Sequence, residues 1–421
     1  MTPPVTPPVS PLMRRAAAGL VRYAWPGKRG GGTRARRGLP RQPTPVVLTV
    51  ACSLLLVALG GCTAAQVQGP RSDGAAPAPA SVPPAAAPRP PNPRPNVYRD
   101  TLRGGRSPAV TGVPERIYVP NSKSASVDVI DPQSFKVVAH DVVGQSPQHV
   151  TPSWDLRRLY VDDTYSNELT VLDPRTGTPT GKPIPVADPY NLYFTPDGRT
   201  AIVVAERFGR LDCYDPRTWR LRNRVAIPAA GPDHLDFSAD GRFLVVSTEF
   251  SGWLFKVSTT SMRVTGRAYV GGLPVDVRLS PDGTVFYVAN QGLGGVTLLN
   301  AATLRPIGFL ATGSGAHGLA VSRDTRRLYV SNRLAGTISV VSFASRTVEA
   351  TWRVGGSPDM LQVTPSGNQL WVSNRFNASV SVIDTTTGRA LRVIQVGSSP
   401  HGLALFPQPG RMSLGHNGVY R

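Results

Sequence analysis

Short apolar stretches, separated by polar turns, fill the last three quarters of the chain. One five-residue pattern keeps returning, as FYVAN at Phe286–Asn290 and LYVSN at Leu328–Asn332. Runs of four to eight residues rich in Val, Tyr, Phe and Ile that are bounded by turn residues predict β-strands. We find no stretch with the 3.6-residue period of a long amphipathic helix. The pattern therefore predicts an all-β chain.

The five-residue pattern occurs seven times at an almost constant spacing. Successive copies lie 42, 42, 43, 42, 42 and 42 residues apart, counted at the second residue of each copy: Tyr118, Tyr160, Ile202, Val245, Tyr287, Tyr329 and Trp371. A fixed period of this length indicates a repeat architecture, in which each repeat is one supersecondary unit. Seven units then form one domain.

Turn residues divide each repeat into four strands. Pro-Asp-Gly, as at 281–283, precedes the recurring strand and links it to an earlier one. Thirteen residues after each counted position stands a residue that favours a turn: Asp131, Asp173, Asp215, Ser258, Asn300, Ser342 and Asp384. Four strands in about 40 residues predict a propeller blade.

The position two residues before that turn is apolar in six repeats. Cys213 occupies it in the third repeat, which explains this cysteine as a core residue in place of valine. Lys256 occupies it in the fourth repeat, and the pattern gives no reason for a lysine there.

The words YVAN, YVSN, VSVID and SPHGLAL resemble the repeat consensus of the YVTN, or YncE-like, seven-bladed β-propellers of exported bacterial and archaeal proteins. The resemblance covers Arg116 to Pro407. Repeats three and four depart from the consensus, with Ala205 and Thr248 where asparagine is usual. The resemblance implies seven four-stranded antiparallel blades.

The order of strands also predicts how the ring closes. The first complete pattern is the second strand of a blade, whereas the last strand, His401–Phe406, is an innermost one. We expect it to join the three strands of residues 117–143, which would remove an open sheet edge.

Composition agrees with a turn-rich fold, since the chain of 421 residues contains 42 Gly and 42 Pro. The formal net charge of +20 suggests a nucleic-acid partner at first. Residues 1–106 carry 15 Lys/Arg and 2 Asp/Glu, which is +13 of this charge. The excess therefore belongs mostly to the amino-terminal region, and nucleic acid is disfavoured as a partner.

The amino-terminal region predicts export. Nine Lys/Arg and no acid precede an apolar run that begins at Pro45 and ends in Leu59-Gly60-Gly61-Cys62. A basic region, an apolar region and a stretch of small residues are the three parts of a secretory signal. The ending also resembles a bacterial lipobox, in which Cys62 would be the lipidated residue. A single membrane-spanning anchor is the alternative, but the run is shorter than the ~20 residues that spanning requires. Arg36-Arg37 leaves twin-arginine export open beside the general route.

We divide the chain accordingly into a signal peptide (1–61), an Ala/Pro-rich tether (62–106), the propeller (107–410) and a short tail (411–421). The tether cannot bury a core and favours extended polyproline conformations. We expect a monomer anchored through Cys62 to the outer face of the cytoplasmic membrane.

Candidate binding residues follow from where propellers place their inner strands. Four of the six histidines each fall within two residues of the start of a different inner strand. We therefore expect them to surround the channel mouth. Imidazoles and carboxylates together suit a divalent metal or acid–base chemistry, although strand-entry hydrogen bonding would also explain them. The candidates are His149, Asn191, Asp233, His234, Asp276, His317, Asp359 and His401.

Loops between second and third strands should gather at the same mouth. They carry Glu206 and Glu249 on neighbouring repeats, and Arg333 and Arg375 on two others. Arginines there would suit a carboxylate or phosphate group, and solvated loop charges are the alternative.

We find no zinc-finger spacing, phosphate-binding glycine loop, haem-attachment motif or nucleophile elbow. The sequence favours a non-enzymatic binding or scaffold protein whose ligand or protein partner it does not specify, and a divalent metal is the one candidate cofactor. A propeller enzyme, similar to lactonases, streptogramin-lyase-like proteins or quinone-dependent dehydrogenases, stays open, and a DNA-binding propeller ranks below it.

Overall fold

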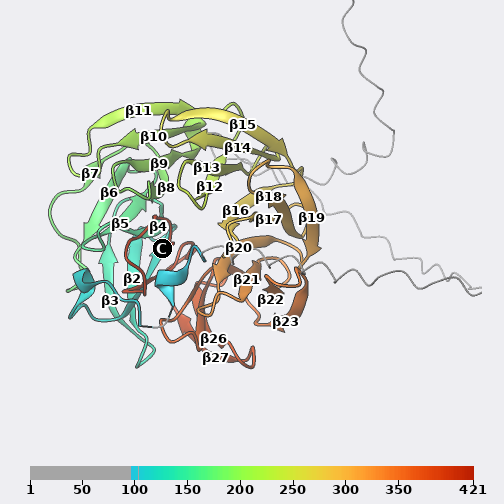
Figure 1. Cartoon of the computed structure of the whole chain (residues 1–421). Helices are drawn as coiled ribbons and strands as arrows, with labels where there is room; N and C mark the ends of the chain where they lie inside the picture. Colours follow the sequence, from blue (N-terminus) through green and yellow to red (C-terminus); the bar gives the residue numbers. More distant parts are fainter. Residues whose placement is uncertain (1–95, 103) are drawn as a thin grey trace, which may run out of the picture. The chain divides into compact units, whose positions relative to one another are not determined.

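The computed structural model describes residues 96–102 and 104–421, which form a ring of seven four-stranded antiparallel sheets around a central channel (Figure 1). The predicted all-β, seven-bladed fold is confirmed. The predicted signal peptide, Cys62 and the tether up to residue 95 lie outside the described residues. In the described part of the chain, no helix has the length and apolar character needed to cross a bilayer.

The blades are numbered from the first strand, and each is given with its innermost strand first. Blade 1 contains β28 (Ala404–Phe406), β1 (Arg116–Asn121), β2 (Ser126–Asp131) and β3 (Lys136–Val142); blade 2, β4 (Pro147–Pro152), β5 (Leu159–Asp163), β6 (Glu168–Leu172) and β7 (Ile184–Pro185); blade 3, β8 (Pro189–Phe194), β9 (Ala201–Ala205), β10 (Arg210–Tyr214) and β11 (Leu221–Ala226); blade 4, β12 (Pro232–Phe237), β13 (Phe243–Thr248), β14 (Trp253–Ser258) and β15 (Arg263–Tyr269).

Blade 5 contains β16 (Pro274–Leu279), β17 (Val285–Asn290), β18 (Gly295–Asn300) and β19 (Pro306–Ala311); blade 6, β20 (Ala316–Val321), β21 (Arg327–Asn332), β22 (Thr337–Ser342) and β23 (Val348–Arg353); blade 7, β24 (Pro358–Val363), β25 (Gln369–Asn374), β26 (Ser379–Asp384) and β27 (Ala390–Gln395). Three short 3-10 helices accompany them: η3 (Arg99–Thr101), η4 (Pro108–Val110) and η5 (Glu206–Phe208).

The hydrophobic core lies between the blades. Each interface between neighbouring blades holds one cluster of buried side chains, which explains why the recurring strand is apolar on both faces. Tyr287 of β17, for example, shares a cluster with Leu319 and Val330 of blade 6. Because every blade needs two neighbours to bury both faces, the ring is stable only when it is closed.

Polar residues of the repeat fix the turns and join the blades. Asp131 and the equivalent turn residues accept hydrogen bonds from backbone N–H groups two or three residues later, as Asp131 does from Gln133 at 2.9 Å and Ser258 from Ser261 at 3.2 Å. In the pattern YVSN of β21, the Ser331 hydroxyl donates to the carbonyl of Asp359 on the next blade. The Asn332 amide donates to Ser339 Oγ at 3.0 Å. The recurring Ser-Asn pair is therefore structural.

The two unusual residues at the apolar position two residues before the turn are both explained by the structure. Cys213 is buried in the cluster between blades 3 and 4, as its position predicted. Lys256 is half-buried, and its Nζ lies 3.9 Å from the centre of the Phe243 ring. A cation over an aromatic face is favourable, so this lysine keeps its charge near solvent while its stem packs on the blade.

The ring closes as expected, although the closing strand spans Ala404–Phe406 and is shorter than the predicted His401–Phe406. β28 pairs antiparallel with β1, with Ile117 opposite Leu405 and Tyr118 opposite Ala404. One blade is therefore built from both ends of the propeller, and the chain has no unpaired inner edge at this junction.

The tail after β28 was not predicted to have a structural role, and the structure places it in the channel. Residues 413–420 form a hairpin in which the Leu414 N–H donates to the carbonyl of Val419 at 2.7 Å. The hairpin also pairs with β8, since the Phe194 N–H donates to the carbonyl of Leu414 at 3.0 Å. The carboxyl end of the chain accordingly appears at the centre of the ring in Figure 1.

Closure by β28 predicts the effect of two truncations. Deleting the chain from Pro400 onward removes β28 and opens the ring, so we expect loss of a cooperative thermal transition in differential scanning calorimetry. Deleting only residues 407–421 keeps β28, so we expect a cooperative transition at a lower temperature. An unchanged transition in the first variant would contradict this closure.

Candidate functional site

The starts of the seven inner strands converge at one end of the channel, which we call the mouth. His149 of β4 lies next to His234 of β12 and His401 beside β28, with ring centroids 5.3 and 4.8 Å apart. His317 of β20 lies 5.8 Å from His401 and completes the set. All four side chains are buried. The convergence expected from the repeat register is therefore observed, and these rings lie inside the channel rather than on its rim.

Asp359 of β24 is the central carboxylate of this region. It is fully buried, and one oxygen lies 2.8 Å from His317 Nδ1 while the other lies 2.9 Å from His401 Nδ1. The Arg333 guanidinium forms a close ion pair with it, with Nε at 3.1 Å from Oδ1. Arg375 contacts the ring of His401 and lies 3.7 Å from Asp359 Oδ2. One carboxylate thus holds two arginines and two histidines.

The charges of this group follow from its surroundings. Burial alone would raise the pKa of Asp359, but Arg333, His317 and His401 outweigh it and hold the pKa well below the ordinary value. Burial and the neighbouring Arg375 lower the pKa of His401 well below its ordinary value, and burial lowers that of His317. Asp359 is therefore ionised and both imidazoles are neutral near pH 7, which leaves one uncompensated positive charge among the two arginines.

Asp233 and His234 form a second buried pair on β12. His234 Nδ1 lies 2.8 Å from Asp233 Oδ1, and neither side chain is exposed. Burial opposes the charge on both groups, but their mutual attraction outweighs it, so the pKa of Asp233 is lowered and that of His234 is raised.

The tail hairpin adds two residues that the sequence analysis did not select. Its tip places Asn417 Oδ1 at 2.9 Å from His149 Nδ1, and His416 Nδ1 at 3.0 Å from Asn191 Nδ2. Five of the six histidines therefore lie in the channel, whereas His140 pairs with Asp128 in blade 1. The signal for the hairpin was Gly415-His416-Asn417-Gly418, a turn sequence between apolar Leu414 and Val419.

Two further candidates have local partners. Asn191 donates to the Tyr193 hydroxyl as well as contacting His416. Asp276 accepts a hydrogen bond from the backbone N–H of Leu319 at 2.9 Å and is paired with Arg278. Asp276 thus joins blades 5 and 6 below the mouth.

The rim of the mouth is formed by the loops that carry Glu206, Glu249, Gln291, Arg333 and Arg375, and three of these residues form a hydrogen-bonded chain over blades 4 to 6. Gln291 Nε2 donates to Glu249 Oε1 at 3.3 Å, and Arg333 Nη1 donates to Gln291 Oε1 at 3.1 Å. Burial, together with the charges of Asp233 and Glu249, raises the pKa of Glu206 to about 9. Burial and Asp233 raise the pKa of Glu249 to about 7. The rim therefore has one side with excess positive charge and one side with carboxyls that hold protons.

The far end of the channel is covered by the two ends of the described chain. Tyr98 donates from its hydroxyl to the carbonyl of Leu279 at 2.8 Å, and the Arg323 guanidinium donates to the Gln408 side-chain oxygen. A cavity of about 70 Å³ lies between these segments. Burial lowers the pKa of Arg323 to about 10. The mouth carries the candidate residues, and the far end is packed.

Chemically, the mouth combines imidazoles, carboxylates and guanidinium groups. Neutral imidazole is a ligand for divalent transition metals, and guanidinium suits carboxylate or phosphate. Cys213 is not available as a nucleophile, because burial between blades raises the pKa of its thiol to about 12. The candidate chemistry of the mouth therefore rests on its imidazoles, carboxylates and guanidinium groups and not on Cys213.

Several solved structures share the fold at low sequence identity. A putative 6-phosphogluconolactonase from Bacteroides fragilis is 17% identical with a TM-score of 0.58, covering 70% of this chain and 98% of that one. Hydrazine synthase from Kuenenia stuttgartiensis is 21% identical with a TM-score of 0.56, covering 65% of this chain and 92% of that one. The dihydro-heme d1 dehydrogenase NirN is 15% identical with a TM-score of 0.55, and the match covers 74% of this chain and 78% of that one. Identities this low establish the fold alone.

No curated protein sequence matches the chain significantly. The profile of the YNCE-like beta-propeller family matches residues 96–409, which include all seven blades. The repeat pattern, the blade topology and this match agree with one another. The chain belongs to the YNCE-like beta-propeller family.

Proposed function

We propose that the protein is an extracytoplasmic binding protein that uses the rim of its channel mouth to bind a small polar ligand carrying a carboxylate or phosphate group. The observation that carries this proposal is the sharing of one carboxylate, Asp359, by two arginines. An anionic ligand would supply the missing negative charge in a partly desolvated place, where charge-assisted hydrogen bonds are strongest.

Arg375 is the residue with the greatest capacity for a ligand. Its side chain is 24% exposed and lies 3.7 Å from Asp359, whereas Arg333 is 11% exposed and closely paired. Guanidinium has five N–H donors, so Arg375 can offer a bidentate contact to an incoming anion. Across the rim, Glu206 and Glu249 would accept hydrogen bonds from polar groups on the same ligand.

Export and anchoring are part of the proposal. The basic segment, the apolar run from Pro45 and the lipobox-like ending at Cys62 support lipidation on the outer face of the membrane. The Ala/Pro-rich tether would then hold the propeller away from the bilayer while the mouth collects its ligand.

The rim is tested by replacing Arg375. Arg375→Gln keeps Asp359 paired with Arg333, so we expect a folded protein that binds succinate or inorganic phosphate at least about tenfold more weakly than wild type, equivalent to about 1.4 kcal/mol. Isothermal titration calorimetry measures this. The matched control is Arg327→Gln, which removes an exposed arginine paired with Glu349. Equal affinities in all three proteins, or no binding to wild type, would refute the rim as an anion site.

The raised pKa of Glu206 predicts a pH-dependent stability. The folded protein keeps a proton on this carboxyl up to about pH 9, whereas the unfolded chain loses it near pH 4.3, so stability falls as pH rises between these values. Glu206→Gln cannot ionise, and its advantage in melting temperature over wild type should grow from pH 5 to pH 8, reaching at least about 3 °C.

Thermal melts at several pH values measure this difference. Glu349→Gln, an exposed glutamate paired with Arg327, serves as the control and should run parallel to wild type. Parallel curves for Glu206→Gln and wild type would show that the carboxyl is not held protonated.

Anchoring is tested at Cys62. The variant Cys62→Ala has no thiol for acylation, so it should leave the membrane fraction and incorporate no labelled palmitate, while Cys213→Ala should behave as wild type. Cell fractionation with acyl labelling measures both. A Cys62→Ala protein that is still acylated and membrane-bound would rule out this anchor.

A further inference from the structure

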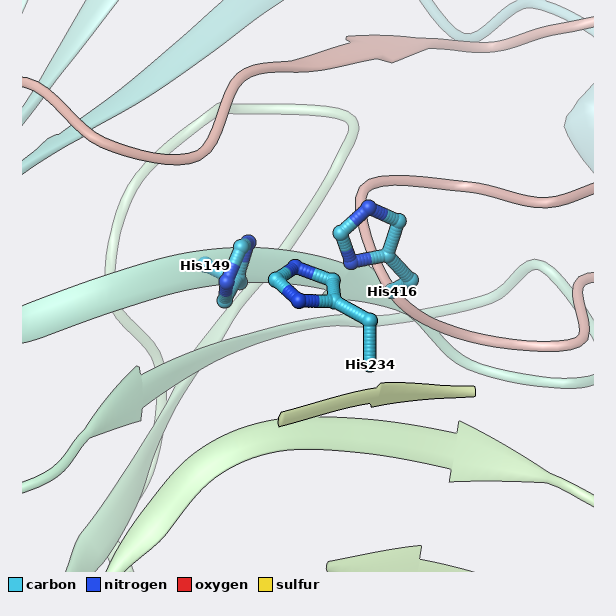
Figure 2. A group of neighbouring side chains, drawn as sticks. All are labelled: His149, His234 and His416. Atoms are coloured by element: carbon cyan, nitrogen blue, oxygen red, sulfur yellow. The ribbon is translucent and has the colours of Figure 1, made fainter. Parts of the chain in front are cut away.

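Three histidines from distant parts of the sequence meet inside the channel. His149 of β4, His234 of β12 and His416 of the tail hairpin are all buried, and one ring nitrogen from each lies within 4.8 Å of the others. Figure 2 shows the three rings turned toward one another, with His416 on the loop near the carboxyl end. The ring centroids of His234 and His416 are 4.7 Å apart, and those of His149 and His416 are 4.9 Å apart.

In the described part of the chain, two of the three histidines have a ring nitrogen without a hydrogen-bond partner, whereas both ring nitrogens of His416 contact the side-chain amides of Asn191 and Asn417. Among the described residues, neither His149 Nε2 nor His234 Nε2 has one, although both are buried. A buried polar atom without a partner costs about 1–3 kcal/mol, so two such atoms in neighbouring rings need an explanation. A ligand that accepts electron pairs from both nitrogens would provide it.

The outer nitrogen of each of these two rings faces an oxygen atom, as a hydrogen bond at His149 and as a close contact without hydrogen-bond alignment at His234. Asn417 Oδ1 lies 2.9 Å from His149 Nδ1, and Asp233 Oδ1 lies 2.8 Å from His234 Nδ1. Metal-binding histidines in proteins characteristically donate their other N–H to a carboxylate or carbonyl oxygen, which fixes the tautomer and the ring orientation. The Asp233 carboxylate also offers negative charge at this short distance from the ring of His234.

We infer that His149, His234 and His416 bind one divalent transition-metal ion of the zinc class inside the channel. Imidazole suits zinc, copper, nickel and iron, whereas magnesium and calcium require oxygen ligands. Metal–nitrogen bonds of 2.0–2.1 Å correspond to nitrogens about 3.4 Å apart in a tetrahedral site, so small rotations of the rings from their present separation complete the geometry. The site uses neither Arg333 nor Arg375 and is independent of the rim.

The third ligand gives the metal a structural consequence. His416 belongs to the tail hairpin, which is held in the channel by backbone pairing with β8 and by Asn417. A metal bound to all three histidines therefore fastens the tail to blades 2 and 4. The ring itself does not require the metal, but the docking of residues 413–420 is strengthened by it.

The experiment uses the full chain without a polyhistidine tag, stripped with a chelator and titrated with Co²⁺ and Zn²⁺. We expect one tight site per chain, with Co²⁺ absorption bands of a nitrogen-ligated site that Zn²⁺ abolishes. His416→Ala and His149→Ala should each lose about 100-fold in affinity or more, because removing a ligand costs more than the 10–100-fold of an outer partner. Asp233→Asn should lose about 10–100-fold.

The matched control is His140→Ala, which removes a histidine of blade 1 that lies outside the channel and should bind like wild type. A second measurement does not depend on variants that fold poorly: Zn²⁺ should slow hydrogen exchange of residues 412–421 in the wild-type chain. Absence of a tight site in wild type, equal affinities of His140→Ala and His416→Ala, or tail exchange that Zn²⁺ does not change would each overturn the inference.

Discussion

The antiparallel pairing of β28 with β1 is the interaction on which the rest of the structure depends. Seven blades bury their faces only against one another, so each cluster of the core requires a closed ring. Closure is made by three residues of a strand that ends at Phe406. Because the chain leaves β28 at the centre of the ring, the residues that follow can enter the channel, and the hairpin at 413–420 does so.

The filled channel sets the chemistry of the mouth. Out of water, burial lowers the pKa of His149, His317, His401 and His416, whereas Asp233 raises that of His234. The carboxylates need partners there, and each charge acts strongly on its neighbours. Asp359 meets this demand with two arginines, and Asp233 meets it with His234. Burial and the nearby charge of Asp233 outweigh the more distant arginines at Glu206 and Glu249, and raise the pKa of both. The mouth thus carries a charge imbalance suited to a ligand, and a histidine cluster suited to a metal lies beneath it.

The repeating part of the sequence predicted the repeating part of the structure. The 42-residue register predicted the blades, the closing strand and the convergence of His149, His234, His317 and His401, because equivalent positions in a ring face the same channel. The tail was missed because it has no copy elsewhere in the chain. The inward turn of Arg333 onto Asp359 was also missed, since the register places backbones and does not fix long side chains.

The central claim is that the tail hairpin occupies the channel and completes a three-histidine cluster with the inner strands. A crystal structure of the full chain grown with Zn²⁺, with anomalous diffraction recorded at the zinc edge, tests it most directly. The account predicts one anomalous peak about 2.0–2.1 Å from a nitrogen of each of His149, His234 and His416, with residues 413–420 paired to β8. A channel without the hairpin, or a zinc peak only at other side chains, would contradict it.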